Sequence, residues 1–158
     1  YPFNQIQIED QDICEFPCAD TSDFVYWDQS CLSECEHPLD SEEYKDRNLC
    51  KFGCEEETDF LYWDQSCETE CADAWIKDTI LDRNLCQTSC GLTNYTYWDG
   101  SCQNNCLVPL EIGSYKGVAT CEFPCPEESD HILLNSSCSD SCPFPYDTET
   151  KRGKNFCV

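Results

Sequence analysis

Cysteines recur at a fixed spacing along the chain, and this spacing limits what the chain can fold into. They stand at 14, 18, 31 and 35, at 50, 54, 67 and 71, at 86, 90, 102 and 106, and at 121, 125, 138 and 142, with Cys157 after them. Each module reads C-x3-C-x12-C-x3-C-x14, with one residue fewer in the third. A period of this length is typical of tandem arrays.

Other side chains repeat together with the cysteines. Tyr26-Trp27-Asp28 returns as Tyr62-Trp63-Asp64 and as Tyr97-Trp98-Asp99. The sequence therefore predicts an N-terminal lead at 1–13, four cysteine-rich modules at 14–49, 50–85, 86–120 and 121–156, and the start of a fifth register at 157–158.

Seventeen of the 158 residues are cysteine, a density typical of scaffolds held by disulfides in an oxidising compartment. A module of this size is too small to fold on a hydrophobic core alone. A disulfide that closes a loop of about 15 residues contributes about 3 kcal/mol by constraining the unfolded chain. We therefore predict a small disulfide-rich repeat array of short β-hairpin loops in a rod, with little regular secondary structure.

Three disulfide schemes fit the spacing. Pro17, Gly53 and Pro124 lie in the x3 segments and disfavour a helical hairpin, which would join the first cysteine to the fourth and the second to the third. Phe24–Trp27 favours a strand and Asp99-Gly100 a hairpin turn. A row of single-disulfide loops is preferred, and a crossed module, first to third and second to fourth, stays open. The preferred pairs are Cys18–Cys31, Cys35–Cys50, Cys54–Cys67, Cys71–Cys86, Cys90–Cys102, Cys106–Cys121, Cys125–Cys138 and Cys142–Cys157.

The preferred scheme leaves one cysteine over. This is Cys14, whereas the other two schemes would leave Cys157. An odd cysteine in a secreted protein suggests an intermolecular bond. We expect Cys14 to bond to a cysteine outside these 158 residues, in an upstream segment of a longer precursor or in a neighbouring subunit.

The last module carries a resemblance to a known family. The run Asn135-Ser-Ser-Cys-Ser-Asp-Ser-Cys-Pro-Phe-Pro-Tyr, followed by a polar loop and Asn155-Phe-Cys, resembles furin-like or growth-factor-receptor-type cysteine-rich repeats. The version abundant in surface and secreted proteins of ciliated protists is the most similar. Judged by the spacing of the cysteines, the resemblance covers residues 14–158. It implies a rod-like extracellular spacer without an active site.

One aromatic position recurs in three modules. Trp27, Trp63 and Trp98 occupy it, and Leu134 takes it in the fourth module. Leucine can fill a small core but cannot stack on a sugar, so we predict module core here rather than a carbohydrate platform. A second aromatic segment, Asp73–Asp82 with Trp75, has the pattern of a short amphipathic helix.

Two sequons, Asn94-Tyr95-Thr96 and Asn135-Ser136-Ser137, mark acceptors for N-glycans in a secreted chain. Asn135 aligns with Asp28, Asp64 and Asp99. We therefore predict glycans on Asn94 and Asn135 and a solvent-facing position at this place in every module.

The formal net charge is −23, with 32 acidic and 9 basic residues. This charge excludes nucleic acid as a partner, because phosphate would be repelled. Solubility is the preferred interpretation of the acidic residues. Ca²⁺ between modules is the weaker alternative, since no stretch matches the Asp-x-Asp-x-Asp-Gly calcium loop. No apolar run is long enough to form a transmembrane segment, so we expect an extracellular, secreted protein.

The sequence offers little for catalysis. Its two histidines, His37 and His131, lie in different modules, and no phosphate loop, Gly-x-Ser-x-Gly or His-Glu-x-x-His occurs. Extracellular oxidation favours disulfides over zinc at the C-x3-C pairs. We expect no enzyme and no cofactor, but an acidic glycoprotein rod that self-associates or meets a neighbouring extracellular protein in a fibril, coat or matrix. A receptor-like or secreted module that binds a protein ligand is the alternative.

Overall fold

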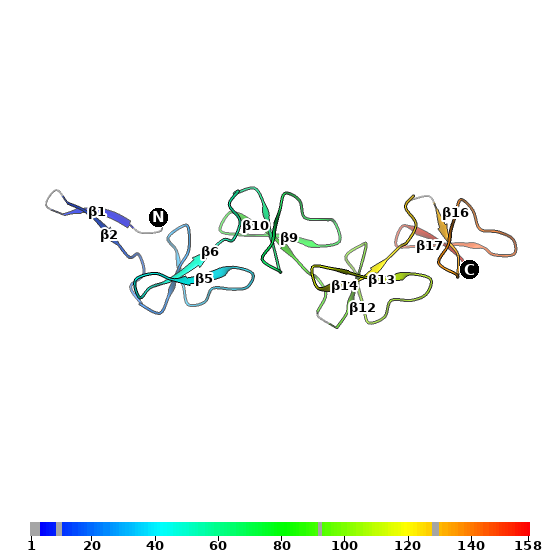
Figure 1. The fold of residues 1–158 in the computed structure, drawn as a ribbon, viewed down its shortest axis with the longest axis horizontal. Coiled ribbons are helices and arrows are strands. Elements are labelled where there is room, and N and C mark those ends of the chain that lie inside the picture. The colour runs from blue at the N-terminus through cyan, green and yellow to red at the C-terminus, as the bar shows by residue number, and fades with distance from the viewer. Residues whose placement is uncertain (1–3, 9–10, 92, 128–129) are drawn as a thin grey trace. The chain divides into compact units, whose positions relative to one another are not determined.

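The computed structural model of the chain describes residues 4–8, 11–91, 93–127 and 130–158, and it describes 4–14 by backbone alone. Within these residues the chain is all-β and contains no helix. One two-stranded hairpin precedes four similar four-stranded sheets (Figure 1). Each of these sheets is stapled by two disulfides. The predicted array of short, disulfide-stapled hairpins is confirmed.

The hairpin and the four sheets use short strands throughout. The hairpin consists of β1 (Asn4–Ile8) and β2 (Gln11–Glu15). The first sheet contains β3 (Phe24–Val25), β4 (Cys31–Leu32), β5 (Asp40–Glu43) and β6 (Asn48–Lys51), and the second β7 (Phe60–Tyr62), β8 (Cys67–Glu68), β9 (Ile76–Ile80) and β10 (Arg83–Gln87). The third contains β11 (Tyr95–Tyr97), β12 (Cys102–Gln103), β13 (Glu111–Tyr115) and β14 (Val118–Glu122), and the fourth β15 (His131–Ile132), β16 (Cys138–Ser139), β17 (Thr148–Lys151) and β18 (Lys154–Cys157).

All four sheets share one topology. In the first, the strand order is β4-β3-β6-β5, with antiparallel pairs at both ends and a parallel pair, β3 with β6, in the middle. Two hairpins are therefore joined edge to edge. The outer strands are polar and the middle strands carry the buried side chains, which suits a half-covered sheet.

The folding repeats are offset from the sequence modules. Each sheet lies between the second cysteine of one module and the first cysteine of the next, so repeats 1 to 4 are 18–51, 54–87, 90–122 and 125–157. The N-terminal hairpin has the register of the second half of a repeat. Gln5 lies opposite Cys14 as Ser41 lies opposite Cys50.

Two kinds of turn shape each repeat. The second hairpin turns through two residues with positive φ, Lys45 (51°) and Asp46 (60°) in repeat 1, which is the type I′ geometry that suits twisted strands. In repeats 3 and 4 the second of these residues is Gly117 or Gly153. The first hairpin turns through a residue of positive φ before its second cysteine, and in repeat 3 this residue is Gly100, as the Asp-Gly signal predicted.

The predicted helix at Asp73–Asp82 is wrong. Ile76–Ile80 forms β9, the outer strand of the second sheet, and the chain then turns at Leu81 and Asp82, both with positive φ. The β-branched residues Ile76, Thr79 and Ile80 favour this strand, because its neighbour β10 is fixed in the sheet by Cys86.

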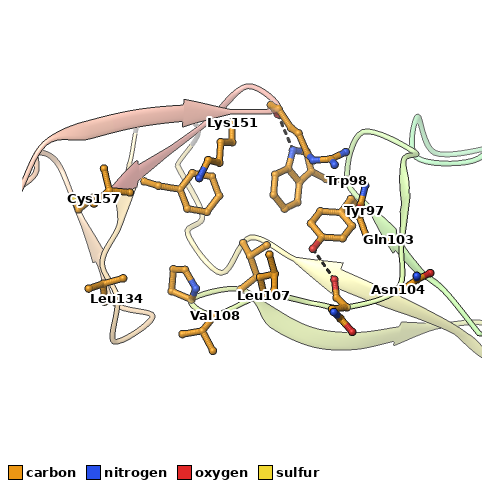
Figure 2. A pocket seen from close by; sticks show the side chains of 15 residues that line it. Tyr97, Trp98, Gln103, Asn104, Leu107, Val108, Leu134, Lys151 and Cys157 are labelled. Carbon is orange, nitrogen blue, oxygen red and sulfur yellow. Dashed lines mark hydrogen bonds between the residues drawn. The ribbon is translucent and has the colours of Figure 1, made fainter.

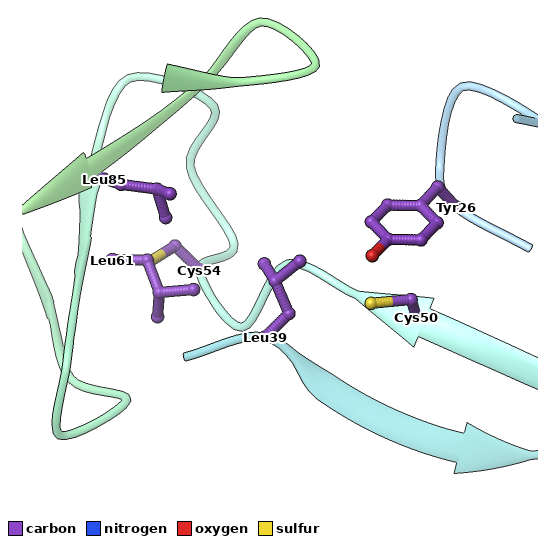
Figure 3. Close-up of a cluster of buried hydrophobic side chains, with 6 residues drawn as sticks. All are labelled: Tyr26, Leu39, Cys50, Cys54, Leu61 and Leu85. Atoms are coloured by element: carbon purple, nitrogen blue, oxygen red, sulfur yellow. The ribbon is translucent and has the colours of Figure 1, made fainter. Parts of the chain in front are cut away.

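The repeats group into two compact parts, which we describe one at a time. The first part contains Tyr1–Cys71 and Lys77–Gln87, and the second Ala72–Ile76 and Thr88–Val158. In the first part, Leu39 of repeat 1 lies among Cys54, Leu61 and Leu85 of repeat 2 (Figure 3). In the second part, Leu110 of repeat 3 packs in the same way against repeat 4, and its neighbours are Cys125, Ile132 and Phe156. The core thus continues from one repeat into the next within each part.

Candidate functional site

Disulfides take up the sixteen cysteines from Cys18 onward. The pairs are those of the row of loops: Cys18–Cys31, Cys35–Cys50, Cys54–Cys67, Cys71–Cys86, Cys90–Cys102, Cys106–Cys121, Cys125–Cys138 and Cys142–Cys157. They are not those of the crossed module or of the helical hairpin. The side chain of Cys14 lies outside the described residues, so its intermolecular bond stays a prediction.

One cluster of metal-type ligands occurs among the described residues. It consists of Cys125, Asp130 and Cys138. The two cysteines are bonded to each other, and zinc binds thiolates rather than disulfide sulfur. This cluster is therefore part of the disulfide framework.

The Tyr-Trp-Asp-x-Ser segment forms the first turn of repeats 1 to 3. Each tyrosine ring is buried, and its hydroxyl donates to a backbone carbonyl eight residues on, at 2.8 to 3.0 Å. Burial raises the pKa of Tyr26. The aspartate side chain accepts the backbone N–H of the serine two residues later, as in Asp28 and Ser30 at 2.9 Å. Hydrogen bonding with Ser30 lowers the pKa of Asp28.

The tryptophan of this turn reaches the next repeat. Trp27 Nε1 donates to the Leu81 carbonyl at 3.1 Å, and Trp98 Nε1 donates to the Arg152 carbonyl at 2.9 Å. Both acceptors are the first of the two positive-φ residues of a type I′ turn in the following repeat. The two indoles also make edge contacts with Phe52 and Phe123 respectively. We call this arrangement the tryptophan junction.

Of the four residues predicted as module core, Trp27 and Trp98 pack against the buried clusters, whereas Leu134 is largely exposed. The three tryptophans are half-buried, and Leu134 is 59 % exposed. The buried ring of each turn is the preceding tyrosine, because its side chain faces its own sheet while the next residue faces away. Leu134 carries no N–H and cannot donate the bond that Trp27 and Trp98 make.

The two described junctions differ in their polar contacts. In the first part, His37 Nε2 lies 2.6 Å from the Trp63 carbonyl, and Gln65 donates to Asp40 at 2.7 Å. In the second part, Arg152 lies 3.1 Å from Asp99 and stacks over Tyr97. Burial alone would raise the pKa of Asp99, but hydrogen bonds from Ser101 and the charge of Arg152 outweigh it, so this pKa is lowered.

An apolar pocket of about 520 Å³ opens beside the junction of the second part (Figure 2). Its lining includes Leu107 and Val108, which are 64 % and 79 % exposed, and Leu134. The corresponding residues of repeats 1 and 2 are Glu36, His37 and Trp63. The second part thus exposes two apolar side chains, Leu107 and Val108, at positions where the first part has Glu36 and His37.

The two predicted glycan acceptors occupy different settings. Asn135 is exposed in the first turn of repeat 4, where its Oδ1 accepts the Ser137 hydroxyl at 2.6 Å. Asn94 is half-buried, and its backbone N–H donates to the Gly91 carbonyl. Asp28, Asp64 and Asp99 are also exposed, as the alignment with Asn135 predicted. The glycans themselves stay a prediction.

No family model, no curated protein and no solved structure matches this chain. The resemblance to furin-like repeats therefore reduces to the part that the fold supports, a tandem array of disulfide-rich hairpin units. The eight disulfides indicate an oxidising and hence extracellular environment. Among the described residues, no helix has the length and apolar character needed to cross a bilayer.

Proposed function

We propose that this chain is a non-catalytic extracellular structural or surface protein, which assembles into or decorates a fibril, coat or matrix. The observation that carries the proposal is the tryptophan junction. The same indole-to-carbonyl bond, 54 residues apart in sequence, joins repeat 1 to repeat 2 and repeat 3 to repeat 4. A chain that repeats one joint can be extended without a new interface, which suits a load-carrying or space-filling element.

Two further features support an extracellular material. Disulfides close every repeat and make it resistant to unfolding outside the cell. The net charge of −23 keeps the surface hydrated, and the exposed outer strand β5 (Asp40–Glu43) is an acidic part of it. The rod shape and the self-association expected from the sequence belong to this proposal.

Negative-stain electron microscopy of the native material tests it. We expect filaments, ordered layers or a continuous matrix that an antibody against the chain labels along its length. Discrete single-chain particles in the native fluid, with no labelled assembly, would contradict the proposal.

A second candidate is a module that binds a protein ligand, and the apolar pocket of the second part favours it. Leu107, Val108 and Leu134 give that pocket an exposed apolar rim. Apolar patches of this kind mark contact sites for other proteins. Val108→Asp should abolish ligand capture under this candidate, whereas it should leave filament formation through the tryptophan junction intact.

A further inference from the structure

Repeat 3 has polar side chains where the other repeats have apolar ones. Thr96 occupies the place of Val25, Leu61 and Ile132, which are fully buried, and it is itself only 1 % exposed. On the neighbouring strand, Thr120 is 8 % exposed. Its place is taken by Leu49, Leu85 and Phe156 in the other repeats. Three sister repeats thus show that apolar residues suit both positions.

The hydroxyl of Thr96 has no hydrogen-bond partner among the described residues. A buried hydroxyl without a partner destabilises a fold relative to a paired hydroxyl or an apolar group. Thr120 is satisfied, because its hydroxyl donates to Glu122 at 2.7 Å. Thr96 therefore lowers the stability of repeat 3, and an apolar residue at this position would avoid that loss. Local exceptions of this kind are typical of functional sites.

These groups line a cavity of about 440 Å³, a volume within the range of small-molecule sites. Trp75 enters it from the loop between β8 and β9 of repeat 2 and stacks on Tyr115 of repeat 3, with ring centroids 5.6 Å apart. In the matching loops of repeats 1 and 3, Leu39 and Leu110 take this place and pack into apolar clusters. The remaining lining includes the rings of Trp98 and Phe123.

Charged groups and a glycine complete the cavity. Glu122 and Lys154 lie in its lining, so the site offers one carboxylate and one ammonium group, with no net charge. Gly113, opposite Thr120 in the sheet, leaves room for the side chains of Glu122 and Thr120, because a Cβ there would lie 2.1 Å from Glu122 Oε1 and 2.7 Å from Thr120 Oγ1. The matching residues are Glu42 in repeat 1 and Glu149 in repeat 4.

We propose that this cavity binds a neutral saccharide ring. The aromatic faces receive the C–H side of a pyranose, and the hydroxyls, the carboxylate and the ammonium group exchange hydrogen bonds with its hydroxyls. The site is built mainly on repeat 3, with Trp75 from repeat 2 and Lys154 from repeat 4, and it differs from the sugar platform that the sequence disfavoured at the repeated tryptophan. The inference goes beyond the proposed function and does not rest on it.

The test is saturation-transfer NMR and tryptophan fluorescence on the intact chain, with chitotriose, cellotriose and laminaritriose as probes. We expect one of them to bind at or below about 10 mM, the weak end of specific recognition. Thr96→Val copies the residue of repeat 1 and should weaken binding at least about tenfold, since it removes the hydroxyl at constant shape. Its thermal stability should equal or exceed that of the parent.

Two further variants complete the test, one beside the cavity and one control outside it. Gly113→Glu, which copies the residue of repeats 1 and 4, should also abolish binding because the new side chain would displace Glu122 and Thr120. Thr79→Val makes the same chemical change as Thr96→Val at an exposed position of β9 and should leave binding unchanged. The proposal is overturned if no probe binds at that concentration, which would leave the cavity to water, or if Thr96→Val binds as well as the parent.

Discussion

Removing the indole of Trp98 should loosen the joint between repeats 3 and 4. Trp98→Ala deletes the bond to the Arg152 carbonyl and the edge contact with Phe123. A fully buried tryptophan contributes about 3 to 5 kcal/mol against alanine, and a half-buried one correspondingly less. We therefore expect a loss of about 2 to 3 kcal/mol, of which the hydrogen bond accounts for about 1 kcal/mol.

Hydrogen exchange of the backbone amides in β17 and β18 measures this loss with the disulfides intact. Exchange in Trp98→Ala should be about 30 to 150 times faster, because each 1.4 kcal/mol changes an opening equilibrium tenfold. Trp98→Phe keeps a ring but no N–H, and should give roughly a fivefold increase.

Leu134→Ala is the matched control. Leu134 has the same place in the turn of repeat 4, but it is exposed and makes no indole bond, so its replacement should change stability by less than about 0.5 kcal/mol. Equal exchange rates in Trp98→Ala and Leu134→Ala would refute the tryptophan junction as a stabilising contact.

Three further predictions concern chemistry at single positions. Asn94 and Asn135 should both carry N-glycans, so N-glycosidase treatment should convert both to Asp by mass spectrometry, and unmodified Asn at both would remove the claim. The lowered pKa of Asp99 means that its carboxylate stabilises the fold above pH 3.8 and that this contribution is lost as pH falls through the lower folded-state pKa. The parent should have a higher free energy of unfolding than Asp99→Asn, and this difference should shrink as the pH is lowered. A difference that persisted at pH 2 would contradict the prediction. The Cys14 peptide should be disulfide-linked to a cysteine outside the 158 residues, and a free Cys14 thiol would show the opposite.

The framework of the fold was predictable because cysteine spacing carries it. Cys31 follows Cys18 by 13 positions and Cys50 follows Cys35 by 15 positions, and these spacings recur in nearly every repeat. Turn residues narrowed the pairing further, since Gly100 does take positive φ. Local chemistry thus predicted the hairpins and the row of loops.

The role of the tryptophan was not predictable in the same way. Its hydrogen-bond partner is 54 residues away and is a backbone carbonyl, which leaves no side-chain signature at Leu81 or Arg152. The segment Asp73–Asp82 predicts a helix because an outer strand that pairs along one edge and then turns has a similar apolar pattern. One signal was available for the cavity, namely that Thr96 and Thr120 break the apolar pattern of their sister positions.

Non-reducing peptide mapping tests the central claim, a tandem row of repeats each closed by two consecutive loops. After proteolysis without reduction, the first repeat should yield Cys18 joined to Cys31 and Cys35 joined to Cys50, and the later repeats should yield the equivalent pairs. Links from Cys14 to Cys31 and from Cys18 to Cys35, with Cys157 left over, would contradict it and indicate the crossed module instead.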